Sequence, residues 1–344
     1  MDICFIMYPW DAVDPKKDST LRIIHEAVKR GHTVSITTPK NLTIRDCITM
    51  AFCETFEKTE TISKNFVSFY KHAQFKKHML PLEGFDTIFM RDNPPMDSFI
   101  LNFLDSVKNN VFILNSVEGL REANNKVYTA SYYDPDYNLI PATYVSKNKE
   151  YLKKVIDEHD GEKMIMKPLD GFGGSGVIVI EKSARQNINS LLDFYIDGIS
   201  GGTSNYVILQ EYVEGAEDGD VRVLMLNGEP LGAMRRVPPK NDPRSNFSVG
   251  GSVKKHVLGK GELKLCRRIG KKLVQDGLYF VGLDLIGEKL IEVNVMSPGG
   301  IVNINHLNKC KLQEDIINFI EDVTNYEKKL SERKVALKEQ VKNA

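Results

Sequence analysis

A glycine-rich stretch is the sharpest chemical feature of the sequence. Gly171-Phe172-Gly173-Gly174-Ser175-Gly176 carries so few Cβ atoms that consecutive backbone amides can approach a polyphosphate closely. Residues 177–180 follow as a second apolar strand, whereas the dinucleotide-binding fingerprint opens a helix. The phosphate-loop pattern of Gly, four residues and Gly-Lys-Ser/Thr does not occur. The stretch is expected to be either a hairpin flap over phosphate or a plain turn, and a nicotinamide-dependent oxidoreductase is disfavoured.

A lysine stands just before this stretch. Lys167 follows three apolar residues, 164–166, and precedes Pro168. This setting favours a buried, aimed ammonium over the usual solvated one. A fixed ammonium beside the flap would meet a phosphate oxygen.

Two apolar strands near the carboxyl end carry oxygen ligands suited to magnesium. Asp284 lies in one strand, and Glu292 and Asn294, two residues apart and so on one face, lie in the next. A three-residue loop, 287–289, would place Asp284 opposite Glu292, and a two-residue loop would turn it to the wrong face. Two carboxylates and an amide are what magnesium bridging nucleotide phosphates requires. The alternative is a solvated sheet face.

An arginine shares a predicted strand face with an aspartate. Asp220 and Arg222 point one way, and Val221 and Val223 the other. An arginine aimed into a water-poor cleft can offset the charge on a transferred phosphoryl group. The plainer alternative is an exposed ion pair with Asp220. The sequence has no Ser-His-Asp spacing, Gly-x-Ser-x-Gly elbow or His-Glu-x-x-His.

Composition limits the classes of protein that remain. The 344 residues predict two or three sub-domains, and 46 basic against 46 acidic residues give no overall attraction to nucleic acid or anionic lipid. The five cysteines are scattered without Cys-x-x-Cys spacing, which is typical of a reduced cytoplasm. No signal peptide and no apolar run of the ~18 residues that a membrane span needs are present. We expect a cytoplasmic protein that binds neither membrane nor nucleic acid.

The expected helices and strands that position these residues follow two patterns along the chain. In the first part, strands at 3–7, 33–38, 85–90 and 111–114 alternate with helices, which predicts a parallel sheet, with 45–80 as an excursion from it. Helices follow at 117–133 and 149–158. Beyond Gly161 many strands with short turns predict an antiparallel-rich second half. The charged end, 321–344, is expected to be a solvated helix or, alternatively, a helix that contacts a partner.

The order of these motifs resembles the ATP-grasp superfamily, and within it the bacterial-type glutathione synthetase family, across nearly the whole chain to about residue 320. The resemblance is carried by Lys16-Lys17-Asp18-Ser19, Met90-Arg91-Asp92-Asn93-Pro94-Pro95, Asn125-Lys126, Lys167-Pro168-Leu169-Asp170-Gly171, Val281-Gly282-Leu283-Asp284 and Glu292-Val293-Asn294. It implies an α/β fold of ATP-grasp architecture. An N-terminal parallel-sheet domain of Rossmann-like (pre-ATP-grasp) type would span 1–122, a lid domain 123–205, an antiparallel C-terminal domain 206–320 and the helical tail 321–344.

The resemblance also implies roles for single residues. The nucleotide would be held by Lys126 and Lys167 at the phosphates, by the flap Gly171, Phe172, Gly173 and Gly174, by Gln210, Glu211, Tyr212 and Val213 at the adenine, and by Asp220 at the ribose. The reacting phosphoryl group would face Arg222 and Arg236, and Mg²⁺ or Mn²⁺ would be held by Asp284, Glu292 and Asn294. The substrates would lie against Lys17, Asp18, Ser19, Arg91, Asn246, Ser297, Gly299 and Gly300.

The implied activity is an ATP- and magnesium-dependent ligation of γ-glutamylcysteine and glycine through an acyl phosphate, in a homotetramer. Two departures leave the substrates open: Arg91-Asp92-Asn93 stands where the family often has Arg-Lys-Asp, and Ser297-Pro298 continues Gly-Gly-Ile-Val instead of Thr-Cys-Ile-Arg. A related ligase with another acid or amine is therefore one alternative. An inactive ATP-binding module is another, which the joint retention of Lys167, Arg222 and Asp284 disfavours.

Overall fold

The computed structural model describes residues 1–169, 175–198, 205–239 and 251–342, which form two compact units. The first unit comprises residues 1–121, 276–279 and 299–344, and the second comprises 122–275 and 280–298. Residues 299–320 thus group with the N-terminal part of the chain. No helix of the described ranges combines the length and the apolar character that crossing a membrane would need.

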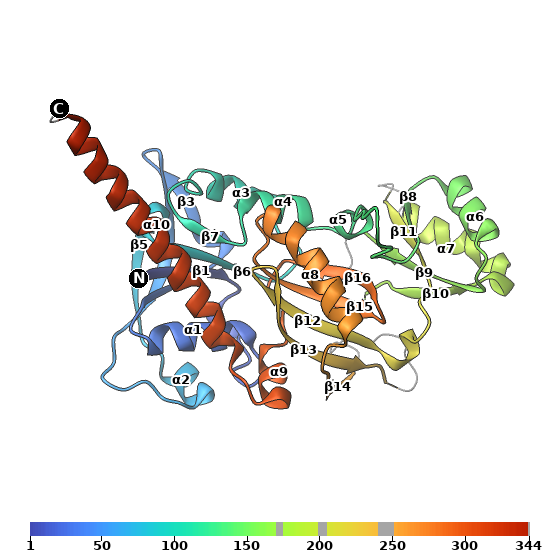
Figure 1. The fold of residues 1–344 in the computed structure, drawn as a ribbon, viewed down its shortest axis with the longest axis horizontal. Coiled ribbons are helices and arrows are strands. Elements are labelled where there is room, and N and C mark those ends of the chain that lie inside the picture. The colour runs from blue at the N-terminus through green and yellow to red at the C-terminus, as the bar shows by residue number, and fades with distance from the viewer. Residues whose placement is uncertain (170–174, 199–204, 240–250, 343–344) are drawn as a thin grey trace. The chain divides into compact units, whose positions relative to one another are not determined.

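The first unit is built on a mixed sheet with helices around it (Figure 1). Strands β2, β1, β6 and β7 run parallel in that order, as expected from the alternating pattern. Its elements are β1 (Asp2–Met7), α1 (Ser19–Lys29), β2 (Thr33–Thr37), β3 (Leu42–Arg45), β4 (Ile48–Phe56), α2 (Phe66–His72), β5 (Phe75–Pro81), β6 (Thr87–Arg91), α3 (Ser98–Asp105), β7 (Phe112–Leu114), α4 (Val117–Ala123), α9 (Ile301–Asn308) and α10 (Leu312–Lys342).

The expected excursion at 45–80 is instead part of the sheet. Strand β4 pairs antiparallel with β2, β3 and β5 and so extends the parallel strands. One face of β4 is buried and the other is partly open, and Phe56 and Phe75 pack edge-on or tilted against Trp10 and each other. Phe52 is exposed on the open face, so bulky residues occur on both faces of β4 and hide the period of two.

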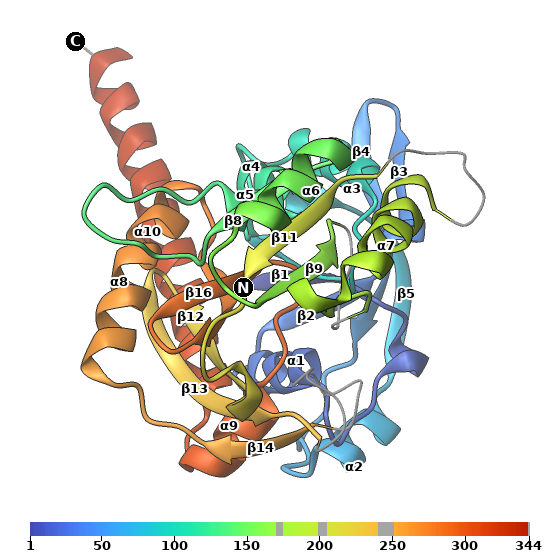
Figure 2. The same ribbon diagram turned by 90° about the vertical axis from the view of Figure 1, so that its right-hand side faces the viewer.

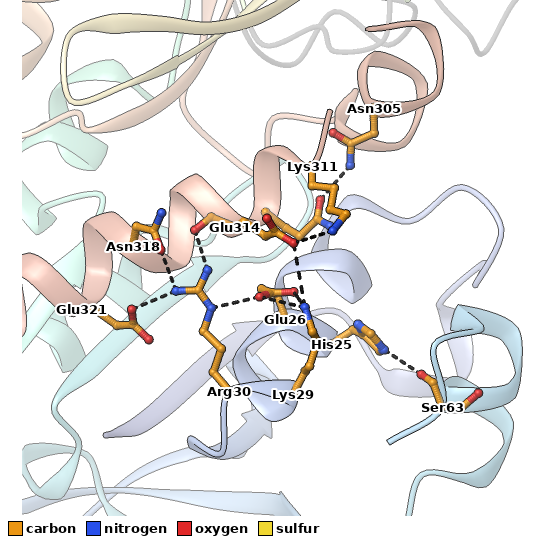
Figure 3. Close-up of polar contacts among 11 residues, drawn as sticks. His25, Glu26, Lys29, Arg30, Ser63, Asn305, Lys311, Glu314, Asn318 and Glu321 are labelled. Carbon is orange, nitrogen blue, oxygen red and sulfur yellow. Dashed lines mark hydrogen bonds and ion pairs between the residues drawn. The ribbon is translucent and has the colours of Figure 1, made fainter. Parts of the chain in front are cut away.

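Helix α1 begins at a capping aspartate and ends before a glycine. The Asp18 carboxylate accepts a hydrogen bond from the Leu21 amide at 2.7 Å and caps the helix, and Gly31 adopts φ 84° just after its end. Its apolar side chains are buried, and α10 packs on it. Arg30, at the end of α1, reaches α10 and contacts Glu321 and Asn318 there (Figure 3).

The second unit holds two antiparallel sheets, ordered β10-β9-β11-β8 and β14-β13-β12-β15-β16 (Figure 1). Both confirm the antiparallel texture expected of this half. The elements are α5 (Val127–Ala130), β8 (Thr143–Ser146), α6 (Lys149–Glu158), β9 (Lys163–Pro168), β10 (Ile178–Glu181), α7 (Arg185–Asp197), β11 (Val207–Glu211), β12 (Asp220–Leu226), β13 (Glu229–Val237), β14 (Ser252–Lys255), α8 (Lys260–Gln275), β15 (Phe280–Ile286) and β16 (Lys289–Asn294).

Candidate active site

A pocket of the second unit gathers most of the residues expected to bind nucleotide. It is lined by both sheets of that unit. The predicted residues in its wall are Lys126, Lys167, Gln210, Glu211, Tyr212, Val213, Asp220, Arg236, Asp284 and Glu292. Residues that lie over 160 positions apart in the chain are thus brought to one cavity.

The hairpin β15–β16 places the predicted metal ligands on one sheet face with the help of a backbone irregularity that the sequence does not show. Asp284 stands directly opposite Glu292, as expected. The connecting turn is nevertheless the two residues Gly287 and Glu288, with Gly287 at φ 56°. A β-bulge beside Asp284 supplies the extra residue that restores the facing. The turn is thus the two-residue alternative. It does not put Asp284 on the wrong face, because the bulge compensates for the shorter loop.

Two arginines hold the Asp284 carboxylate. Arg222 donates to it from Nε at 2.5 Å and from Nη2 at 3.0 Å, and Arg236 donates from Nη2 at 2.9 Å. Burial alone would raise the pKa of Asp284, but the two guanidinium groups outweigh it and hold the pKa at about 2. Arg222 is buried, so the exposed ion pair with Asp220 is excluded.

Asp220 instead accepts a hydrogen bond from Arg236 Nε at 2.6 Å, directly across β12 and β13. This position lies in the pocket wall, where the resemblance placed the ribose. Arg236 therefore joins Asp220 and Asp284 through one guanidinium. These two ion pairs hold the Arg236 side chain in one conformation.

Two ammonium groups face the carboxylates. Lys167 is buried and donates to Gln210 Oε1 at 3.0 Å, while Lys126 Nζ lies 4.0 Å from the Glu292 carboxylate. Burial, reinforced by Lys126, lowers the pKa of Lys167 to about 8 although Glu292 and Asp284 oppose the shift. The pocket thus offers two fixed cations to an anionic ligand.

The sequence analysis missed the apolar walls of the pocket. Ile165 and Val179 are cross-strand partners in the sheet β10-β9-β11-β8, and Ile286 and Ile291 lie on the β15–β16 hairpin. Such walls suit a flat aromatic ring. In the sequence these isoleucines and valines look like ordinary strand residues, so no pattern could single them out.

The segment predicted to bind adenine, residues 210–213, lines the pocket at the end of a strand. Strand β11 ends at Glu211, and Tyr212 and Val213 continue beyond it. The Gln210 side chain does not point into an open wall: its amide donates to Thr143 Oγ1 at 2.9 Å and accepts from Lys167. Gln210 thereby orients the buried ammonium.

The first unit brings together several of the predicted substrate residues. Arg91 at the end of β6 is buried and donates to Thr20 Oγ1 at 3.0 Å, and Tyr8 at the end of β1 donates to the Asp18 carboxylate. The Gly300 amide donates to Ser19 Oγ at 3.2 Å. These contacts gather at the carboxyl ends of β1 and β6, between which the strand order reverses and where open α/β sheets bind ligands. Tyr8 and Thr20 were not predicted.

The remaining predicted residues are less informative. Lys17 is exposed, and Ser297 adopts φ 41° in the second unit, whereas Gly299 belongs to the first. The described ranges do not include Gly171, Phe172, Gly173, Gly174 and Asn246.

The donor set fits a hard divalent cation. Asp284 and Glu292 face each other across the hairpin, and Asn294 Nδ2 lies 3.1 Å from Asp284 Oδ2. Loss of solvent and the nearby Asp284 charge both raise the pKa of Glu292. Two carboxylates that repel each other beside an amide gain stability from a cation between them.

Comparisons with known proteins agree with this geometry. The family model of the prokaryotic glutathione synthetase N-terminal domain matches residues 1–121, and that of the ATP-grasp domain of the same family matches residues 125–309. The chain belongs to the prokaryotic glutathione synthetase family. It is therefore an ATP-dependent ligase of the ATP-grasp fold, and the predicted family is confirmed.

Individual relatives extend over almost the whole chain. Glutathione synthetase of Gloeobacter violaceus is 33% identical over 337 residues, which cover 94% of this chain and 98% of the relative. Glutathione synthetase of Escherichia coli O127:H6 is 32% identical over 85% of this chain and 89% of its own length. The crystal structure of D-cycloserine synthetase DcsG shares the fold, with a TM-score of 0.61 at 12% identity over 92% of this chain and 99% of that one.

Proposed function

We propose that this ATP-grasp ligase is a glutathione synthetase that joins γ-glutamylcysteine to glycine. A carboxylate oxygen of the peptide attacks the γ-phosphorus of ATP, and ADP leaves. The glycine amine, after losing a proton, then attacks the acyl carbon, the C–O bond to phosphate breaks, and inorganic phosphate leaves as the amide forms. Such a reaction needs positioning and charge neutralisation and no protein nucleophile.

The observation that carries the proposal is the pocket in which two ammonium groups and two buried arginines meet a pair of carboxylates beside apolar walls. Lys126 and Lys167 would hold the phosphates, and Gln210, Glu211, Tyr212 and Val213 would lie along the adenine. Asp220 would lie on the ribose side. Arg222 and Arg236, held in place by Asp284, would face the transferred phosphoryl group.

Asp284, Glu292 and Asn294 would hold Mg²⁺, or Mn²⁺ in its place, which supplies charge neutralisation between the phosphates. The chain's own part is to present the three oxygen ligands on one sheet face and to keep Asp284 ionised. Asp284 has two arginine partners, so it stays in place before any cation binds.

Residues of the first unit would contact the substrates, and Ser297 and Asn246 stay separate predictions for substrate binding. Arg91 is a buried cation, and Asp18, Ser19 and Gly300 are fixed around it by hydrogen bonds. Burial lowers the pKa of Arg91 to about 10, which leaves it charged at neutral pH for a substrate carboxylate. Lys17 and Gly299 would complete the substrate loops. We place the reaction in the cytoplasm, in a homotetramer.

The test is incubation of the purified protein with Mg-ATP, γ-glutamylcysteine and glycine, with ADP release and product mass followed together. ADP release only when both substrates are present, with glutathione formed, supports the proposal. ADP release with another acid or amine would redirect the assignment to a related ligase, with Asp92 and the residues after Pro298 as the guide. Binding of ATP without turnover on any acid would overturn the enzyme and indicate an inactive module.

A further inference from the structure

Helix α10 is anchored to the first unit by its first half only. Arg30 donates to Glu321 at 2.8 Å, to Asn318 at 2.7 Å and to the Glu314 carbonyl at 3.0 Å, while its Nε contacts Glu26 at 2.9 Å (Figure 3). His32 adds a second contact to Glu321 at 2.7 Å. These bonds fix the direction in which the helix leaves the unit.

The second half of α10 has no cover within its own unit. Thr324 is the last buried residue, and every residue from 325 to 342 is exposed. Figures 1 and 2 both show these turns extending away from the other elements of the first unit. A rigidly anchored helix therefore presents a long free surface.

A heptad pattern in α10 begins in its anchored half and continues along the exposed half. Ile316, Val323, Leu330 and Leu337 recur every seven residues, and the first of them is buried in the unit. Leu330 and Leu337 are 46% and 49% exposed, and Tyr326, four residues before Leu330, is 64% exposed. In heptad notation the three leucine and valine residues beyond Ile316 occupy position a, and Tyr326 occupies position d. Such a seam is built to face another helix.

The charges beside the seam select one way of pairing two copies. In a parallel pair, Lys329 at g would meet Lys334 at e of the other copy, and Asp322 would meet Glu327, so both contacts would be repulsive. In an antiparallel pair, e positions meet e positions, and Glu327 would meet Lys334 of the other copy twice by symmetry. Like charges at both of these contacts therefore disfavour the parallel arrangement.

The antiparallel register that makes these ion pairs also brings Tyr326 and Leu337 together, twice by symmetry. It sets Tyr326 against Leu337 of the other copy, Leu330 against the alkyl stem of Arg333, and Val323 against Gln340. The overlap runs from 323 to 340, which is almost the stretch that leaves the unit. Shifting by one heptad in either direction would bring Glu327 against itself or Lys334 against itself.

We infer that the exposed half of α10 pairs antiparallel with α10 of a second copy of this chain, through Tyr326, Leu330 and Leu337 and the reciprocal Glu327–Lys334 ion pairs. The inference does not depend on the substrates of the enzyme. A contact of two short helices is small, so association in the micromolar range is expected.

The test is sedimentation velocity of the full-length protein between about 1 and 100 µM, a range in which such an affinity is visible. The double variant Leu330→Lys/Leu337→Lys is expected to halve the assembled mass at the highest concentration. An assembled mass that is the same for wild type and this variant would overturn the inference, as would a wild type that stays monomeric throughout.

Charge reversals test the direction of pairing. Glu327→Lys and Lys334→Glu should each weaken association at least tenfold, and the two together should restore it. In a parallel pair each single change would create attraction, to Asp322 or Lys329, and would tighten association. Tightening by either single variant would therefore overturn the antiparallel arrangement.

Matched controls separate the seam from the general charge of the helix. Lys328→Glu and Glu332→Lys make the same charge changes at positions f and c, which face away from the seam. Both should leave the association constant within about twofold. Equal weakening by these controls and the seam variants would overturn the specific register.

Discussion

Arg236 Nη2 stands 2.9 Å from Asp284 Oδ2, although the strands β13 and β15 that carry them are not neighbours. The strand between them, β12, contributes Arg222, which donates to the same carboxylate, and Asp220, which accepts from Arg236. Acids and guanidinium groups thus alternate across three strands. Within this set Arg236 contacts both aspartates and Asp284 accepts from both arginines, so removing either of these two removes a partner from two other buried groups.

Removing one guanidinium should therefore cost far more than one hydrogen bond. Arg236→Gln leaves Asp220 and Asp284 short of a buried cation, and we expect the free energy of unfolding to fall by about 3–5 kcal/mol. Urea denaturation measures this loss. Arg235→Gln, one residue earlier and on the other face of β13, should change it by no more than about 0.5 kcal/mol. Equal effects would contradict the ion-pair account.

A buried histidine should make the first unit less stable in mild acid. His25 packs edge-on against Phe66 and Phe69, and its Nε2 lies 2.8 Å from the Ser63 carbonyl, to which it donates in the neutral form (Figure 3). Burial lowers the pKa of His25 below its ordinary 6.5, and Arg22 and Lys29 act in the same direction, against Ser63 and Glu26.

The direction of the pH dependence follows from the number of protons that the folded and unfolded chains bind. As the pH drops below 6.5, the unfolded chain binds a proton at His25 more readily than the folded chain does. The contribution of His25 to the free energy of unfolding is therefore full above pH 6.5 and is lost progressively below it. Urea midpoints at pH 7.5 and 5.5 measure the fall. His25→Gln should reduce the difference between them, while His72→Gln, on the exposed end of α2, should keep it. A difference that survives His25→Gln would assign the effect to other groups.

The face of the hairpin was predictable because strands carry apolar runs in which a lone acid stands out. Asp284, Glu292 and Asn294 were found in this way. The bulge that makes their facing compatible with a two-residue turn was not, since it is a backbone irregularity that no side-chain pattern marks. The partner of Arg222 likewise depends on the register between β12 and β15, 62 residues apart.

The prediction for residues 45–80 was wrong, and the apolar pocket walls were not predicted, because hydrophobic residues gave no clear pattern in either place. Strand β4 packs on one face and is partly open on the other, so Phe52 is exposed while Ala51 and Cys53 are buried, and hydrophobicity does not alternate. Ile165 and Ile286 serve as pocket walls with the same residue type that fills a core. Charged residues in apolar strands could be identified from the sequence, whereas the apolar residues that line the pocket could be identified only from the structure.

One glycine of α8 should tolerate no side chain. A Cβ on Gly270 would lie 1.9 Å from the Gly228 carbonyl oxygen, because the helix packs backbone to backbone on the β12–β13 turn. Alanine in a helix interior ordinarily stabilises by about 1 kcal/mol relative to glycine. Gly270→Ala should instead destabilise by about 1–3 kcal/mol in urea denaturation. Gly84→Ala, whose Cβ would meet Pro81 at an ordinary 3.6 Å, is the control, and stabilisation by Gly270→Ala would refute the close approach.

Nucleotide binding should take up a proton at Lys167. Burial and Lys126 lower the pKa of this lysine to about 8, so part of the free protein carries a neutral amine at neutral to alkaline pH. A polyphosphate beside the side chain favours the ammonium and raises the pKa again. The ATP dissociation constant should therefore rise above pH 8, by up to about tenfold per pH unit.

Isothermal titration calorimetry at pH 8.5 in buffers of different ionisation enthalpy measures the proton directly. We expect an uptake of up to one proton per ATP, and its loss in Lys167→Met, because Gln210 holds only that ammonium toward the pocket. Lys163→Met removes a half-exposed lysine from the same strand and should leave the uptake unchanged. Uptake that persists in Lys167→Met would move the titration to another group, and a pH-independent dissociation constant would mean that Lys167 is not at the phosphates.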